Sequence, residues 1–288
     1  MILKSCAKLN LYLEVLGIRK DDYHNLKTLF ERIDLADTIT LTPRRDSLIK
    51  VSCSHPRVPS GSANLCYRSA QLLQDACAVN KGADIRIQKR IPVGAGLGGG
   101  SSNAAAVLLG LNKLWRLNLS EKKLVQLGRK IGADVPFFLY NRKFGLGTAR
   151  GDAIKPLKTL DGVRLWHILV VPKIHVSTPL IYRKWDKFYG LTRPKHNVNI
   201  LISGLRKSKP VLQEELLFNS LEVVTTKLYP QVQRVKNALV RLGAEIVLMS
   251  GSGPAVFGIV SSQKEASVLR RKVRALCNNW QVFVARTI

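Results

Sequence analysis

The stretch that decides the fold is PVGAGLGGGSSNAA, residues 92–105. Five of the seven residues at 94–100 are glycine, which frees the backbone for positive φ and for close approach to a ligand. A predicted helix follows at once, so its unpaired N–H groups and the positive end of its dipole would point at a bound anion. A plain turn needs only one or two glycines. The run therefore predicts a phosphate-binding loop that opens a helix.

Two common phosphate loops do not fit this run. Gly94, Gly96 and Gly99 satisfy GxGxxG, a pattern that is weak by itself. The preceding residues 83–88 alternate in polarity, whereas a dinucleotide fold would place a uniformly apolar strand there. The GxxxxGK[ST] pattern of a Walker loop does not occur, and the loop carries no lysine. Both assignments are therefore rejected.

The first half of the chain reads as alternating strands and helices. Residues 7–15 alternate between apolar and polar side chains, which predicts a half-buried strand with Lys8 and Asn10 on one face. A solvent-facing surface is the ordinary interpretation of such a pair. Further strands are predicted at 37–41, 48–52 and 83–88, and helices at 63–77, at 104–114 and from the N-cap Ser120 to 131. Turn-forming residues gather at 150–163, where we expect a domain boundary.

The second half predicts a sheet with helices on one face. A strand is expected at 165–171, followed by a helix for which Thr178 is the N-cap and Pro179 the first helical residue. Short helices to 218 and a long helix at 221–242 come next. The chain then continues with strands at 245–249 and 255–260, a helix at 263–277 and a strand at 280–285. This order suits a split βαβ domain. We therefore expect an α+β protein with domains at 1–156 and 157–288.

Composition sets the class of protein. The chain has 288 residues, of which 46% are hydrophobic and 23% charged, so two domains with real cores are expected and disorder is excluded as the main state. Five cysteines without a CxxC pair support neither a disulfide framework nor a zinc ribbon, and favour a reducing, cytoplasmic compartment. No apolar stretch approaches the roughly 18 residues of a membrane helix. Lys4 and Lys8 interrupt the apolar N-terminus, unlike a signal peptide.

The net charge of +27 raises the hypothesis of nucleic-acid binding without catalysis. Basic residues are nevertheless spread along the chain, with local clusters at 193–195, 206–209 and 270–274. There is no long basic tail and no RNP-like aromatic motif. We therefore expect a solvated basic surface that favours small anionic substrates, with no specific nucleic-acid partner and no membrane association, and keep nucleic-acid binding as the alternative.

Four segments together resemble the small-molecule kinases of the GHMP superfamily. They are the glycine loop, AKLNLYLEVLGIRKDDYHNL at 7–26, GADVPFF at 132–138 and SGSGPAVFGIV at 250–260. Within that superfamily, AKLNLYL and DDYHNL resemble the kinases of non-mevalonate isoprenoid biosynthesis that act on 4-diphosphocytidyl-2-C-methyl-D-erythritol. The resemblance implies a ribosomal-S5-domain-2-like sandwich followed by a ferredoxin-like domain, with ATP and Mg²⁺ used to phosphorylate the 2-hydroxyl. Kinases of mevalonate derivatives or homoserine remain alternatives, and the oligomeric state stays open.

The resemblance assigns catalysis to Lys8 and Asp134. Phosphoryl transfer needs an acceptor for the proton of the attacking hydroxyl and positive charge near the reacting oxygens. Asp134 can accept the proton, while Lys8 can orient the hydroxyl and keep Asp134 ionised. Without the other motifs, Asp134 would be expected to cap a helix that begins at Val135-Pro136.

The resemblance also implies the binding residues. For the substrate these are Asn10, Tyr23, His24, Thr178 and Tyr182, where a tyrosine face and a histidine suit stacking and hydrogen bonding to cytosine. From the residues alone, Tyr23-His24 would be a turn, Thr178 a cap and Tyr182 a packed side chain.

The implied ATP-binding residues extend beyond the loop. They are Asn64, Lys89, Pro92, Val93, Gly94, Ala95, Gly96, Leu97, Gly98, Gly99, Gly100, Ser101 and Ser102, with Ser101 and Ser102 near the phosphates and the metal. The metal ligands themselves are not assigned. The glycine turn at 250–254 is expected to close over the reacting groups, with a tight hairpin as the alternative.

Overall fold

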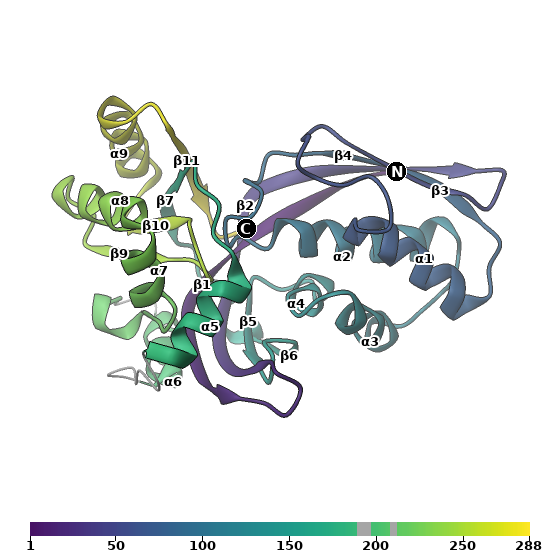
Figure 1. Ribbon diagram of the computed structural model, residues 1–288, viewed down its shortest axis with the longest axis horizontal. Coiled ribbons are helices and arrows are strands. Elements are labelled where there is room, and N and C mark those ends of the chain that lie inside the picture. Colours follow the sequence, from purple (N-terminus) through teal and green to yellow (C-terminus); the bar gives the residue numbers. More distant parts are fainter. Residues whose placement is uncertain (189–196, 208–211) are drawn as a thin grey trace.

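Two long antiparallel strands, β1 (Ile2–Ile18) and β2 (His24–Arg44), form the spine of the first of two sheets (Figure 1). The computed structural model describes residues 1–188, 197–207 and 212–288. The strand order is β3-β4-β2-β1-β8, and β5 and β6 extend from β2. The other strands are β3 (Ile49–Cys53), β4 (Gly82–Gln88), β5 (Phe144–Thr148), β6 (Ala153–Pro156) and β8 (Phe218–Asn219).

Four helices cover one face of this sheet (Figure 1). They are α1 (Leu65–Cys77), α2 (Gly99–Leu114), α3 (Glu121–Ile131) and α4 (Val135–Leu139). Apolar side chains of the helices and of β2 and β4 share one core. The predicted N-cap at Ser120 is confirmed, since its side chain accepts from the Lys123 N–H. The helix predicted from 104 instead begins at Gly99, because the last glycines of the loop form its first turn.

The second sheet has the order β11-β7-β10-β9, with every pair antiparallel. Its strands are β7 (Trp166–Pro172), β9 (Ile246–Met249), β10 (Val256–Val260) and β11 (Trp280–Arg286). The helices α8 (Pro230–Arg241) and α9 (Gln263–Leu276) pack against it. In chain order the strands run 4-1-3-2, which is the predicted split βαβ arrangement.

The remaining helices lie between β7 and α8 in the chain. They are α5 (Thr178–Phe188), α6 (Val198–Leu205), α7 (Glu222–Leu228) and a 3₁₀ turn at Glu214–Leu216, while another 3₁₀ turn, at Lys158–Leu160, precedes β7. The basic cluster at 193–195 and part of the one at 206–209 fall outside the described residues. Of the helices in the described part of the chain, none combines the length and apolar character that a membrane span requires.

The single long helix predicted for 221–242 is wrong. The segment forms two helices, α7 and α8, which are separated at Tyr229 with φ −127° and ψ 82°. Pro230 causes the break, because proline has no N–H to continue a helix and its ring pushes the preceding residue out of the helical region. Strand β8, which pairs with β1 through Tyr12 and Leu13, was not predicted.

A fully buried polar cluster joins the two sheets. Nε2 of His167, on β7, lies 2.9 Å from Oε1 of Glu31, on β2. The Thr287 hydroxyl donates to the same oxygen at 2.6 Å. The chain leaves the first sheet at Pro156 and enters the second at Trp166, although β8 returns to the first. The division into 1–156 and 157–288 stays a prediction.

Replacing Gly110 of α2 by valine is expected to lower the free energy of unfolding by about 1–3 kcal/mol, the usual cost of overpacking a core. A Cβ atom at this position would overlap the Leu41 side chain and lie 2.6 Å from Cδ1 of Leu3. Denaturant unfolding measures the loss. Gly61→Val is the matched control, because a Cβ there meets nothing within 4 Å. Equal stability of the two variants would contradict the close packing of α2 on the sheet.

Candidate active site

Two cavities meet at the glycine loop. The larger has a volume of about 680 Å³ and the smaller about 330 Å³. Gly96, Gly98 and Ser101 line both of them. All the predicted catalytic and substrate-binding residues line the larger cavity, and every predicted ATP-binding residue except Ser102 lines the smaller one.

The loop adopts a conformation that requires glycine. Gly94, Gly96 and Gly98 have φ of 71°, 77° and 66°, the left-handed region that other residues avoid. A Cβ on Gly96 would overlap the carbonyl oxygen of Ser250, and one on Gly98 would lie 2.9 Å from Cγ of Lys8. Gly98 is the N-cap of α2, so the first N–H groups of that helix follow directly. The wall between the cavities is therefore bare backbone at a helix N-terminus.

Lys8 and Asp134 lie together in the larger cavity. Nζ of Lys8 is 3.5 Å from Oδ2 of Asp134, and the two side chains are 5% and 32% exposed. The ammonium also lies 5.3 Å from the centre of the Phe30 ring. Asp134 stands at the N-cap position of α4 but makes no capping hydrogen bond, so its carboxylate remains available.

Asn10 fixes the direction of the lysine. Its Oδ1 accepts from Lys8 Nζ at 2.6 Å, and its Nδ2 donates to the Thr28 hydroxyl at 2.8 Å. That hydroxyl in turn donates to the Tyr12 carbonyl at 2.7 Å. Since donor and acceptor ends of the amide are both engaged, the chain of hydrogen bonds orients Asn10 and, through it, Lys8.

The turn at 250–254 connects β9 to β10 and also contacts the loop. The Ser250 hydroxyl donates to the Gly96 carbonyl at 3.1 Å. The hydroxyls of Ser252 and Thr178 are 2.7 Å apart, and both residues line the larger cavity. Helix α5 begins at Thr178 itself, so the predicted cap at this residue is wrong by one position, and its hydroxyl bonds Ser252.

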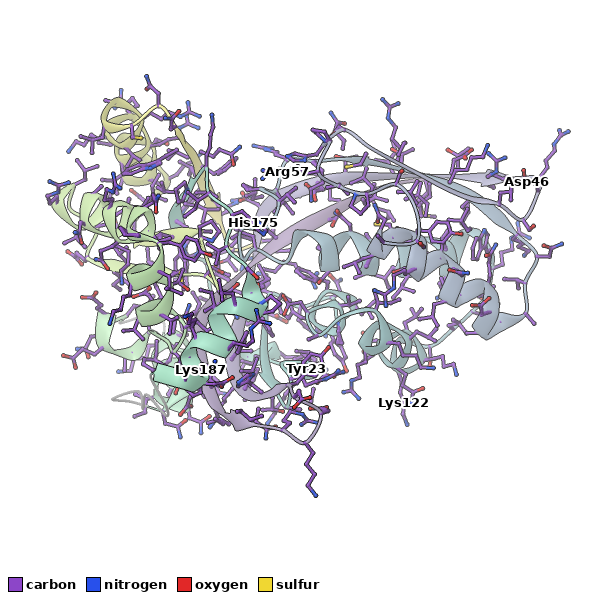
Figure 2. All side chains as sticks on the ribbon, viewed as in Figure 1. Tyr23, Asp46, Arg57, Lys122, His175 and Lys187 are labelled. Carbon is purple, nitrogen blue, oxygen red and sulfur yellow. The ribbon has the colours of Figure 1, made fainter. Side chains whose placement is uncertain are left out.

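Aromatic residues gather at His24 in the same cavity. The rings of His24 and Tyr182 have centroids 4.7 Å apart and are inclined by 32°. Burial, with a smaller contribution from the charge of Asp134, raises the pKa of the Tyr182 hydroxyl, so the phenol stays neutral. Tyr23 is 55% exposed, and the Arg150 guanidinium lies 5.0 Å from its ring centre. Figure 2 labels Tyr23, which lies in the turn between β1 and β2.

Three of the predicted ATP-binding residues have polar groups already engaged within the chain. Asn64 caps α1 by accepting from the Cys66 N–H at 2.8 Å. Nζ of Lys89 pairs with Asp37. The Ser102 hydroxyl is buried and accepts from Ser5 at 2.8 Å, so it reaches neither cavity. Asn64 and Lys89 thus contribute to the smaller cavity as parts of its wall.

Two acidic residues of the site were missed in the sequence. Asp37 accepts from the backbone N–H groups of Arg90 and Ile91, at 2.7 and 2.8 Å, and thereby anchors the start of the loop. Nothing in its local sequence marks it. Asp186 lines the larger cavity one helical turn after Tyr182, so the spacing of Thr178 and Tyr182, continued by one turn, points to it.

Comparison with known proteins agrees with this geometry. The profile of the GHMP kinases N terminal domain matches residues 64–142, and that of the GHMP kinases C terminal domain matches residues 201–279. The 4-diphosphocytidyl-2-C-methyl-D-erythritol kinase of Bacillus subtilis (strain 168) is 42% identical over 285 residues, which cover 99% of this chain and 96% of that protein. The chain belongs to this kinase family.

Other relatives of this kinase agree. The protein of the same name from Geobacillus sp. (strain WCH70) is 41% identical over 290 residues, covering 100% of this chain and 97% of its own. A crystal structure of 4-(cytidine 5'-diphospho)-2C-methyl-D-erythritol kinase superposes with a TM-score of 0.82 at 35% identity, over 99% of this chain and 98% of that chain. Mevalonate kinase of Methanococcus jannaschii, at 16% identity and a TM-score of 0.77 over 100% of this chain and 98% of that one, shares the fold.

Replacing Gly98 of this kinase by valine is expected to abolish ATP binding while the protein still folds. Its Cβ would lie 2.9 Å from Cγ of Lys8 and 3.1 Å from the Phe138 ring, and the valine would require a left-handed φ, at a cost of about 1–2 kcal/mol. Calorimetric titration with ATP measures the effect. Gly100→Ala should bind more tightly than the Gly98 variant, since its Cβ meets only Cδ1 of Leu65, at 3.6 Å. Wild-type affinity of Gly98→Val would make the loop a structural turn only.

Proposed function

We propose that ATP occupies the smaller cavity and gives its γ-phosphoryl group to the 2-hydroxyl of 4-diphosphocytidyl-2-C-methyl-D-erythritol in the larger one. The observation that carries this proposal is the wall of Gly96, Gly98 and Ser101 that the cavities share. A nucleotide whose phosphates lie on the helix N-terminus would present its last phosphorus at that wall. The Lys8–Asp134 pair stands on the opposite, acceptor side.

Asp134 is the base in this proposal. Its carboxylate accepts the proton of the 2-hydroxyl as the oxygen bonds to phosphorus and the bond to ADP breaks. Lys8 donates toward the reacting oxygens, where negative charge develops. Its near-complete burial strengthens that attraction, because little water screens the ammonium. The hydrogen bond from Lys8 to Asn10 keeps the ammonium aimed before substrate binds.

The larger cavity suits a substrate with a base and a diphosphate. Its volume lies within the roughly 300–1,000 Å³ of ordinary ligand sites. Tyr23, His24 and Tyr182 offer ring faces and a hydrogen-bonding imidazole, while Arg150 and Arg183 add positive charge for phosphates. Mevalonate and homoserine carry no nucleobase that could stack on those rings. The aromatic group therefore favours the cytidylyl compound over these alternatives.

We propose Mg²⁺ as the metal that accompanies ATP. The Ser101 hydroxyl, at the wall that both cavities share, is a hard oxygen donor of the kind Mg²⁺ prefers. In the described ranges, no three His, Cys, Asp or Glu side chains gather as metal ligands, and Mg²⁺ in kinases is held largely by substrate phosphates and water. Bound there, it would neutralise charge on the β and γ oxygens.

We further propose a cytoplasmic enzyme without a specific nucleic-acid partner. The reaction consumes ATP, and the free cysteines of the chain suit a reducing compartment. Lys8, Arg150 and Arg183 line the larger cavity and Lys89 lines the smaller one, where positive charge serves small anionic substrates.

Asp134→Asn should lower kcat by about 10²-fold or more, because general-base catalysis contributes roughly 10²–10⁴-fold. The Kd of ATP should stay nearly unchanged, since Asp134 does not line the smaller cavity. Lys8→Ala should likewise reduce kcat more than ATP affinity. A coupled assay of ADP release gives kcat and calorimetric titration gives the Kd of ATP, with Asp161→Asn as a control outside both cavities. Near-normal turnover of Asp134→Asn would remove the base assignment.

The cytidylyl compound should exceed free methylerythritol phosphate in kcat/KM by several orders of magnitude, because unpaired polar groups in the site reject the truncated substrate. Tyr182→Ala, Tyr23→Ala and His24→Ala should each raise its KM about ten-fold, the scale of a base-stacking contact, and raise the KM of ATP far less. The same ADP-release assay measures this. If mevalonate or homoserine were phosphorylated as well as the cytidylyl compound, the protein would still be a kinase, but the proposed substrate would be wrong.

A further inference from the structure

Helix α5 presents one stripe of side chains to the larger cavity. Thr178, Tyr182 and Asp186 follow one another at single helical turns, and all three line it. Thr178 contacts Ser252, and Tyr182 stacks on His24. The third, Asp186, places Oδ1 2.6 Å from Nε2 of the same histidine.

This contact decides which nitrogen of His24 carries hydrogen. A carboxylate accepts hydrogen bonds and donates none, so Nε2 must be the protonated nitrogen. In the neutral imidazole, Nδ1 is then an acceptor with a free lone pair. Within 1–188, 197–207 and 212–288, no hydrogen bond engages Nδ1 of His24. The nitrogen left for a ligand is therefore an acceptor.

The ring is held in this orientation by packing. Tyr182 covers one side of the imidazole, and Trp185 meets it edge-on with centroids 6.2 Å apart at 87°. The His24 side chain is only 8% exposed. Turning the ring to exchange its nitrogens would break the Asp186 contact and disturb both aromatic neighbours. The geometry therefore defines one imidazole orientation before substrate binds.

We propose that Asp186 is a positioning residue that makes His24 selective for the base of the substrate. With Nδ1 as acceptor, the imidazole pairs with the exocyclic amino group of cytosine. Uracil has a keto oxygen at this position, so two acceptors, the oxygen and Nδ1, would face each other. Both groups would stay unpaired, which is costly in a buried site. This inference rests on the proposed function, because it takes the base of the substrate to lie against His24.

The kinetic test compares wild type, Asp186→Ala and Asp186→Asn on the cytidine-linked substrate and its uridine analogue. Asp186→Ala should raise the KM of the cytidine compound about ten-fold or more, the scale of a lost hydrogen bond to a charged group. It should also narrow the ratio of kcat/KM between the two substrates, with the KM of ATP unchanged. Asp186→Asn retains an acceptor oxygen, so its ratio of kcat/KM between the two substrates should stay closer to the wild-type value than that of Asp186→Ala.

Lys187→Ala is the matched control. It changes the next residue of α5, an exposed side chain that Figure 2 labels and that lines neither cavity. This variant should keep the wild-type ratio. A merely structural role of Asp186 would lower stability and activity toward both substrates alike. An unchanged ratio in Asp186→Ala would overturn the inference.

A second measurement needs no substrate. ¹⁵N NMR of the imidazoles, with the His24 signals identified by their loss in His24→Gln, should show hydrogen on Nε2 and none on Nδ1 in the neutral ring. Asp186→Ala should show both tautomers. Protonated Nδ1 in the wild type would overturn the inference even if the kinase is active.

The two proposals fail in different ways. If the wild type does not prefer the cytidine-linked compound, the proposed function falls, and base selection by His24 falls with it. If the wild type prefers that compound and Asp186→Ala keeps the same preference, only the role of Asp186 is lost.

Discussion

The close approach of the glycine loop to both sheets is the contact on which the active site depends. The Lys8 N–H, on β1, donates to the Leu97 carbonyl at 3.0 Å, and the Ala255 N–H, next to β10 of the second sheet, donates to the Ala95 carbonyl at 3.2 Å. Backbone this close to backbone leaves no room for a Cβ at Gly96. The loop is rich in glycine because it is held between two sheets, and its N–H groups consequently stand at a fixed place beside Lys8.

The scarcity of acidic residues makes each buried one informative. The chain has 19 Asp and Glu against 46 Lys and Arg. Oδ1 of Asp37 accepts from the N–H groups at the start of the loop and its Oδ2 meets Lys89 and Asn103, whereas Oε1 of Glu31 contacts His167 and Thr287 between the sheets. Burial of a carboxylate is costly unless donors surround it, so these two fix geometry. Asp134 and Asp186 are partly exposed to the larger cavity and can meet a ligand.

The sequence predicted those features of the structure that short-range sequence patterns determine. The alternation of apolar and polar residues predicted that Lys8 and Asn10 share one face of a strand. The glycine run predicted a loop that leads into a helix, and that helix begins at Gly99. The residue-level assignment of Asp134 needed the other motifs, since its local sequence equally suits a cap. Asp37 could not be predicted, because its partners Arg90 and Ile91 lie far along the chain and meet it only through the pairing of β2 with β4. The break at Pro230 was visible in the sequence and was overlooked.

The larger cavity takes its two sides from different sheets. Lys8, Asn10 and His24 come from β1 and β2, whereas α5 follows β7 of the second sheet and carries the stripe that ends at Asp186. The distance between the Tyr182 ring on α5 and the Lys8–Asp134 pair therefore depends on how the sheets are joined. The buried Glu31–His167 contact spans that junction, and the loop is held from both sides near it. In the proposed function, positioning of the hydroxyl and recognition of the base thus both depend on this interface, to which distant segments of the chain contribute.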